Sequence, residues 1–164
     1  MSITTIVKQL SNDFNNFFIY DFIIDKDDVN FIFNSNSIKK YSIKNPICKI
    51  NIINLDYKKN TFVSSFTIVN KDMVSNFEGC EWEFLENIEV ENCQILILNE
   101  DKLNDVNLDD WLENCITMKE LYNVSEDGKI CITSGFGPGI YRLNGQKNGD
   151  ELIAINIEFI KEHV

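Results

Sequence analysis

The first stretch of the chain repeats apolar residues at intervals of three and four, the spacing that gathers them on one side of a helix. Ser2 stands where its hydroxyl can cap the first turn of such a helix. We therefore predict an N-terminal helix over residues 3–18 that packs its apolar side on a sheet. The apolar positions are Ile3, Ile6, Val7, Leu10, Phe14, Phe17 and Phe18.

From Phe18 onward, Phe, Ile, Tyr and Val come in short runs separated by Asn, Asp, Lys and Ser, a pattern typical of strands and turns. Apolar alternation on both sides of the polar turn 56–60 predicts a hairpin with one buried face. The strands predicted in this region are Ile19–Ile24, Asn30–Phe33, Ile38–Ile43, Cys48–Leu55 and Phe62–Val69.

The second half of the chain adds further strands and a second helix. Asn99 or Asp101 can cap a short helical turn, and Asp109 can cap a longer helix near 108–122. Glycine-rich turns separate the last strands. The strands predicted in this half are Trp82–Leu85, Cys93–Leu98, Lys129–Ser134, Ile140–Leu143 and Leu152–Ile160.

Together these elements predict an α+β fold. It consists of a mainly antiparallel β-sheet with an N-terminal helix and a second helix near 108–122, packed as two layers around Ile and Phe side chains. The chain has 164 residues, of which 44% are apolar and 12 are Phe. This size and composition predict one domain, 1–164, with a core of its own.

Acidic residues outnumber basic residues by 26 to 15, which gives a formal net charge of −11. Such a surface repels nucleic-acid phosphates and anionic membranes, so we expect neither as a partner. The charge either keeps the protein soluble and does no more, or it steers the protein toward a cationic partner protein.

The cysteines predict buried thiols in a reducing compartment, because they have apolar neighbours, are odd in number and include no CxxC pair. We expect no disulfide framework and no zinc site. The start of the chain lacks signal-peptide features, and no run of about 18 apolar residues is present to cross a membrane. We therefore expect a cytoplasmic protein. The five cysteines are Cys48, Cys80, Cys93, Cys115 and Cys131.

Three glycines over residues 135–139 lie between two predicted strands. A phosphate-binding loop would open a helix, whereas a strand follows here, so a strained turn or bulge is the better interpretation. Arg142, the sole arginine, can pair with a carboxylate or phosphate after this turn, although a structural ion pair fits it better. Ser134 lacks a GxSxG elbow and the only histidine is His163 near the C-terminus, so we expect no catalytic serine or cysteine.

Acidic residues gather around Asp25–Asp28, Glu81–Glu86 and Asp105–Asp110. None of these groups has the spacing of an EF-hand loop, so we expect no metal site. They are either solvated surface charge or contacts for a cationic partner. The candidate partner-binding residues are Asp27, Asp28, Glu81, Glu83, Asp105 and Asp109.

Over about residues 41–160, the order of several motifs resembles an uncharacterised bacterial family, the domain of unknown function 4241. The resemblance implies a strand-rich bacterial domain without an assigned activity. Pro138 stands where the family tends to have an acid, so no ligand role of that acid carries over. The motifs are Tyr41–Ile53 with Asn45-Pro46-Ile47-Cys48-Lys49-Ile50, then Phe62–Val69, Glu89–Ile95, Asp110–Cys115, and Ser134-Gly135-Phe136-Gly137 through Tyr141 followed by a closing strand through Phe159.

Our leading hypothesis is a non-catalytic, acidic protein-binding module, for example an immunity protein that masks a basic toxin domain. The alternative is a small ligand-binding domain or enzyme with its site at the glycine-rich turn 134–142, where Ser134, Tyr141 and Arg142 supply polar groups. A structural domain of a larger assembly is a third hypothesis. No catalytic, cofactor-binding or metal-binding residue is assigned.

Overall fold

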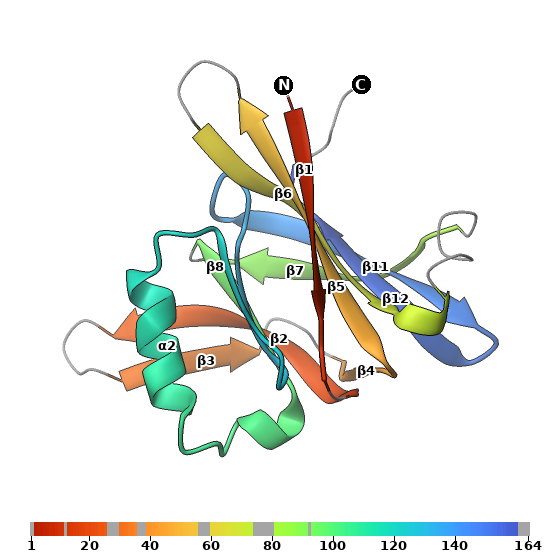
Figure 1. Ribbon diagram of the computed structural model, residues 1–164, viewed down its shortest axis with the longest axis horizontal. Coiled ribbons are helices and arrows are strands. Elements are labelled where there is room, and N and C mark those ends of the chain that lie inside the picture. Colours follow the sequence, from red (N-terminus) through yellow and green to blue (C-terminus); the bar gives the residue numbers. More distant parts are fainter. Residues whose placement is uncertain are drawn as a thin grey trace.

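Two antiparallel β-sheets make up most of the fold in a computed structural model that describes residues 2–11, 13–25, 30–35, 39–55, 60–73, 81–91 and 93–160 (Figure 1). Of residues 22–25 and 30–35, only the backbone is described. In the first sheet, β12, the last strand in chain order, lies between β6 and β11. The strand order of this sheet is β1 (Ser2–Gln9), β5 (Pro46–Leu55), β6 (Asn60–Asn70), β12 (Glu151–Glu158), β11 (Gly139–Asn148) and β7 (Glu83–Val90).

The second sheet has a short strand, β4 (Tyr41–Ile43), beside the beginning of its longest strand. One α-helix, α2 (Leu108–Thr117), and two 3-10 turns, η1 (Lys71–Met73) and η2 (Glu100–Lys102), complete the elements of the described residues. The strand order of this sheet is β3 (Asn30–Ser35), β2 (Phe14–Asp25), β8 (Gln94–Leu98), β10 (Lys129–Thr133) and β9 (Tyr122–Ser125), and β4 pairs with β2.

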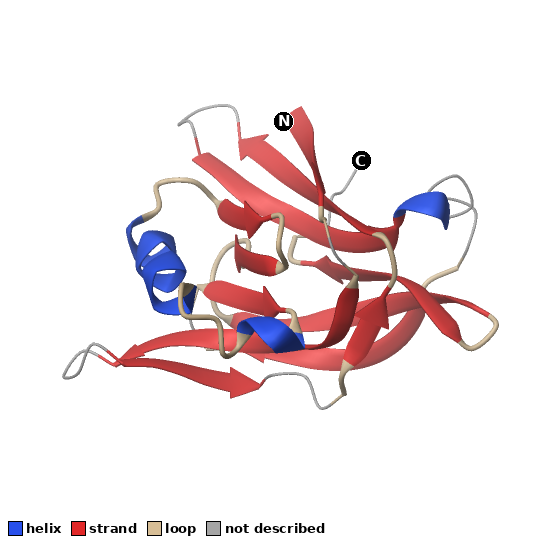
Figure 2. Ribbon diagram, turned by 60° about the horizontal axis from the view of Figure 1, so that its bottom comes forward, coloured by secondary structure: helices blue, strands red, loops and turns tan. Residues whose placement is uncertain are grey.

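The two sheets share one apolar core, and Figure 2 shows their strands in two layers. Successive side chains of a strand point to opposite faces, so each strand contributes every second residue to this core. From the first sheet, β6 contributes Phe66 and Ile68, and from the second sheet, β8 contributes Ile95 and Ile97, all fully buried. Burying an apolar side chain of this size stabilises the fold by roughly 1.5–3 kcal/mol.

The opposite face of the second sheet is covered by α2 (Figure 1). Leu96 and Leu98 of β8 point to this side, where they pack with Leu108, Leu112 and Cys115 of the helix. These three helix residues are spaced four and three apart, which places them on one side of α2. Strand β8 is therefore buried on both faces.

The predicted N-terminal helix over 3–18 is wrong. Ser2–Gln9 forms β1, which pairs with β5, and the following residues lead into β2. Every residue from Ile3 to Val7 is β-branched, and such side chains favour a strand because they crowd the preceding turn of a helix. Ile6 packs on the core, whereas Ile3 and Val7 are 46% and 55% exposed.

Most of the other predicted strands are present, although their ends differ. The mainly antiparallel character of the predicted fold is confirmed. So is the predicted hairpin, because β5 and β6 pair across 56–59, which lie outside the described residues.

Two further predictions need correction. The layer that faces the first sheet is a second sheet and not a layer of helices. The second helix begins after Asn107 and ends at Thr117, so it is shorter than the predicted 108–122. Met118 is already extended, and Tyr122 and Val124 belong to β9, where both pack against the core.

A bulge in β2 positions β4 at the rim of the two sheets. At Asn16, where the register between the two strands shifts, φ is 51°, and the Asn16 N–H donates to Ser42 Oγ at 2.9 Å. Asn99 stabilises the bulge, since its Oδ1 accepts the Asn15 N–H at 3.0 Å and its Nδ2 donates to the Asp13 carbonyl at 2.9 Å. These bonds fix β4 relative to β2.

Candidate functional site

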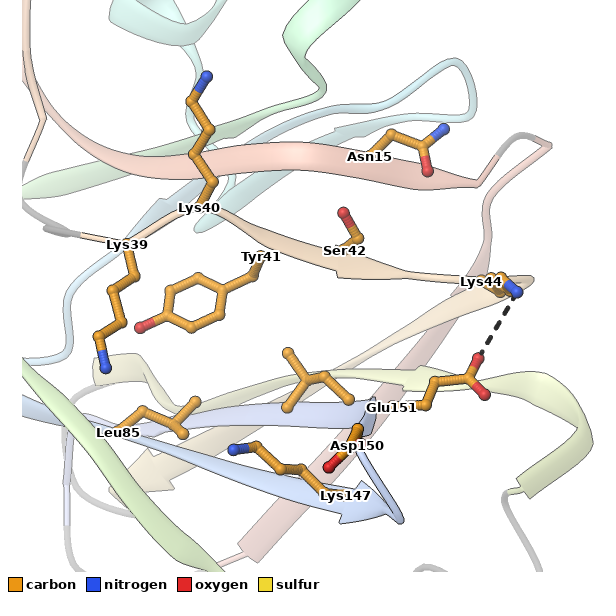
Figure 3. Close-up of a pocket in the computed structure, with 11 residues that line it drawn as sticks. Asn15, Lys39, Lys40, Tyr41, Ser42, Lys44, Leu85, Lys147, Asp150 and Glu151 are labelled. Atoms are coloured by element: carbon orange, nitrogen blue, oxygen red, sulfur yellow. Dashed lines mark ion pairs between the residues drawn. The ribbon is translucent and has the colours of Figure 1, made fainter.

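A cleft of about 660 Å³ opens at the rim of the two sheets, between β4 and the hairpin of β11 and β12 (Figure 3). Its volume lies within the roughly 300–1,000 Å³ that is typical of ligand pockets. Both sheets contribute to its walls. The lining residues are Asn15, Lys39, Lys40, Tyr41, Ser42, Lys44, Leu85, Lys147, Asp150, Glu151 and Leu152.

Four of the lining residues are lysines and two are acids, although the chain as a whole carries a net charge of −11. Two of the lysines have acidic partners: Lys40 Nζ lies 3.2 Å from Glu100, and Lys44 Nζ lies 4.0 Å from Glu151. Figure 3 shows the Lys40 side chain pointing away from the cleft. Both pairs are largely exposed and so contribute little to stability.

Lys39 and Lys147 form no ion pair with any residue that the structure describes. They come from opposite walls, and Figure 3 shows both ammonium groups on the side of the cleft to which the Tyr41 hydroxyl points. Asp150 stands near Lys147 in the same view and is also outside the ion pairs of the described residues. The unpaired charges of the cleft therefore sum to a net positive charge.

Tyr41 forms the floor between the two lysines. Its side chain is buried and its hydroxyl donates a short hydrogen bond to Glu86. Burial and the hydrogen bond and charge of Glu86 raise the pKa of Tyr41 above its usual value, so the hydroxyl remains protonated. Leu85 and Leu152 pack against the core and also line the cleft. The cleft thus combines an apolar floor with ammonium groups at its mouth.

Sequence reasoning missed this site, because none of its lining residues was among the candidates. The residues come from five separate strands or their flanks, and each is ordinary by itself. One signal was present, namely the concentration of Lys39, Lys40 and Lys44 around the short strand of Tyr41 in an otherwise acidic chain.

The glycine-rich turn is tied together by its own side chains. Ser134 is fully buried, and its hydroxyl donates to the Gly137 carbonyl at 2.9 Å. The Tyr141 hydroxyl donates to the same carbonyl at 2.5 Å. Gly135 and Gly137 have φ values of 56° and 121°, a backbone conformation that residues with a side chain rarely adopt. The polar groups at this turn therefore bond within the turn.

Arg142 points to the opposite side of β11 from Tyr141, because neighbouring residues of a strand face opposite ways. The carbon of its guanidinium group lies 4.6 Å from the centre of the Phe84 ring. A hollow of about 310 Å³ includes Tyr141 and Arg142 but not Ser134. The structure therefore brings two of the three predicted ligand-site residues to one hollow and buries the third.

The predicted partner-binding acids lie in different parts of the fold. Glu81 and Glu83 are exposed at the beginning of β7, an edge strand of the first sheet. Asp109 is exposed on α2, which covers the second sheet. Asp27 and Asp28 lie outside the described residues. The structure does not gather these acids into one surface.

Asp105, the remaining candidate, lies in an ion-pair network. Lys129 is 5% exposed, and its Nζ lies 3.5 Å from Asp105 and 3.2 Å from Asp127. The hydrogen bond from the Asn107 N–H and the charge of Lys129 lower the pKa of Asp105. Burial opposes ionisation of Asp127, but hydrogen bonds from Ser125 and Lys129 lower its pKa. Asp105 is thus already paired with a buried cation.

The cysteines are mostly buried, as the sequence indicated. Cys48, Cys115 and Cys131 are fully buried thiols, whereas Cys93 is exposed at the turn before β8, and Cys80 lies outside the described residues. Within the described ranges, no three His, Cys, Asp or Glu side chains gather as a metal ion would require. No helix there has the length and apolar character needed to cross a membrane.

Comparisons with protein-family models, with curated proteins and with solved structures found no match to this chain. The resemblance to the family of unknown function therefore stays a prediction. The function of this protein is therefore inferred from the geometry of its own residues.

We predict that the wild-type protein loses more stability than the Lys129→Met variant between about pH 5 and about pH 3. The pKa values of Asp105 and Asp127 are lowered by folding, from about 3.9 in an unfolded chain. Their stabilising contribution is therefore present above that value and is lost as the pH falls through their folded-state pKa values. Urea unfolding at a series of pH values measures this, with the exposed Lys119→Met as the control. Parallel curves for wild type and Lys129→Met would contradict the prediction.

We also predict that Gly135→Ala destabilises the protein more than Gly149→Ala. The two glycines have similar φ values, 56° and 66°. The unfavourable backbone conformation of an alanine therefore lowers the free energy of unfolding by a similar amount, roughly 1 kcal/mol, at each position. A Cβ atom on Gly135 would lie only 2.9 Å from the Cβ of Phe159, whereas no atom lies within 4 Å at Gly149. Thermal unfolding of both variants tests this, and equal losses would show that the crowding at Gly135 is relieved at no cost.

Proposed function

We propose that this protein is a binding protein whose ligand carries an anionic group and an apolar body, and that the cleft around Tyr41 is its site. The observation that carries the proposal is the pair Lys39 and Lys147, two ammonium groups without acidic partners among the described residues, on either side of an apolar floor. Such a concentration of positive charge is unusual in a chain of net charge −11.

The floor and the mouth of the cleft have different roles in this proposal. A carboxylate or phosphate accepts charge-assisted hydrogen bonds from the two ammonium groups, which orients the ligand. Because both lysines are exposed, each contact contributes only about 0.2–1 kcal/mol. The apolar body rests on Tyr41, Leu85 and Leu152, where each Å² removed from water adds about 25 cal/mol. Affinity is therefore expected to grow with the apolar part of the ligand.

The proposal predicts opposite effects of two neutralising substitutions. Lys147→Gln removes an attraction and weakens the binding of octanoate by about two- to fivefold, whereas Asp150→Asn removes a repulsion and strengthens it by a similar factor. Titrations followed by NMR, with octanol as the uncharged probe of equal chain length, measure both effects. Octanol should bind equally to the wild type and the two variants.

The matched control is Lys119→Gln, which removes an exposed lysine just beyond α2 and should leave octanoate binding unchanged. Equal weakening by Lys119→Gln and Lys147→Gln would show a general charge effect and overturn the assignment of the cleft. Failure of octanoate to shift any resonance of Tyr41, Leu85 or Leu152 would do the same.

A second candidate function is the masking of a cationic protein, as an immunity protein would do, and the edge strand β7 supports it. Glu81, Glu83, Glu89 and Glu91 are exposed on and around this strand, and none forms an ion pair with a residue in the described ranges. Among the described residues, β7 pairs with β11 alone, so its other edge has backbone groups that an extended basic segment can bind.

This second function predicts a basic partner that is retained at low salt and released at moderate salt, because the contacts are between exposed charges. Pull-down from the protein's own lysate, with identification by mass, measures it. Reversal of Glu81, Glu83 and Glu89 to Lys should abolish retention, while reversal of Asp109, Asp110 and Glu113 on α2 should not. Equal effects of the two triple variants would assign the binding to net charge and not to β7.

A further inference from the structure

The outer face of the first sheet, which is turned away from the second sheet, is polar along its middle. Phe66, Ile155 and Ile157 point into the core, so the residues between them on β6 and β12 point outward. The strand register places these outward residues side by side across four strands. They are Thr5, Asn51, Ser65, Thr67, Asn156 and Glu158.

Hydrogen bonds across the strands hold these side chains in place. Thr5 Oγ1 donates to Asn51 Oδ1 at 2.8 Å, and Asn51 Nδ2 donates to Ser65 Oγ at 2.9 Å. Asn156 Nδ2 donates to Thr67 Oγ1 at 2.9 Å, while its Oδ1 accepts no bond from the described part of the chain. The amide groups are therefore fixed in orientation, and acceptor atoms remain for a ligand.

This polar face is hollowed. Asn51, Ser65, Trp82, Asn156 and Glu158 line a depression of about 330 Å³. It adjoins the hollow of about 310 Å³ beside β11, and Glu158 lines both. We call these two neighbouring hollows the groove.

The two ends of this groove carry different planar groups. Trp82 lines the first hollow and is 38% exposed, a large aromatic surface for a side chain outside the core. Arg142 lines the second, where its guanidinium group lies over the ring of Phe84 in a cation–π contact. Outward polar residues alone are ordinary on an antiparallel sheet, but the hollow and the exposed indole are additional features.

We propose that this groove binds a neutral carbohydrate chain. Neighbouring hydroxyl groups of a sugar both donate and accept hydrogen bonds, and planar amide, carboxylate and guanidinium groups offer pairs of atoms in matching geometry. The C–H groups of a sugar ring carry a slight positive charge and pack on the negative face of an indole, so the partly exposed Trp82 is the stacking residue in this proposal. Glu158 and Arg142 have opposite charges, so the groove favours an uncharged ligand, in contrast to the cleft around Tyr41.

The test is a screen of short neutral oligosaccharides of glucose, mannose, galactose and N-acetylglucosamine by saturation-transfer NMR. We expect one of these classes to bind the wild-type protein. The chain has two tryptophans, so Trp111→Phe leaves Trp82 as the sole indole, and its emission should shift when the sugar binds. Trp82→Ala should weaken binding by about tenfold, and Glu158→Gln and Asn156→Ala should weaken it as well.

Two controls separate a sugar site from a general surface effect. Phe136→Ala removes another exposed aromatic ring, which packs on Phe62 and does not line the groove, so affinity should not change. Lys147→Gln should likewise leave it unchanged, because Lys147 lines the cleft. Thermal unfolding shows that each variant is folded. Absence of binding by every oligosaccharide of the screen, equal loss with Phe136→Ala and Trp82→Ala, or loss with Lys147→Gln would each overturn the proposal.

Discussion

The arrangement of the whole fold depends on β8, which must be buried on both faces. Its side chains alternate between Ile and Leu, with Ile95 and Ile97 toward the first sheet and Leu96 and Leu98 toward α2. Exposing either face would return several large apolar side chains to water at roughly 1.5–3 kcal/mol each. Both covers, a six-stranded sheet and a helix, are therefore required. The cleft lies at the rim between the two sheets, and the groove lies on the outer face of the first sheet.

Local chain chemistry predicted the strands better than their assembly. The alternation on either side of the turn 56–60 was enough to give the hairpin of β5 and β6, because a two-residue period implies a strand with one buried face. The helix predicted over 3–18 is wrong because the run of β-branched residues from Ile3 to Val7 favours a strand more strongly than the apolar spacing favours a helix. Alternation also does not say what covers a buried face, so it does not distinguish a second sheet from a layer of helices.

The sites were harder to predict, since they form where distant segments meet. Tyr41, Leu85 and Lys147 have no local relation in the sequence, and only the fold brings them to one cleft. The strained turn predicted at the glycine-rich segment is confirmed, because Gly135 and Gly137 have positive φ values. Tyr141 and Arg142 border one hollow, but their side chains point to opposite sides of β11 because they are neighbours on a strand.

The position of β12 in the middle of the first sheet has a consequence for how the protein acquires its structure. Asn156 bonds to Thr67, 89 positions earlier in the chain, so the two halves of this sheet remain unconnected until β12 is inserted. Contacts of such long range make folding slow. During synthesis, the edge of β6 therefore stays open to pairing with other chains until β12 has been made, whereas β11 is followed at once by β12 in a hairpin.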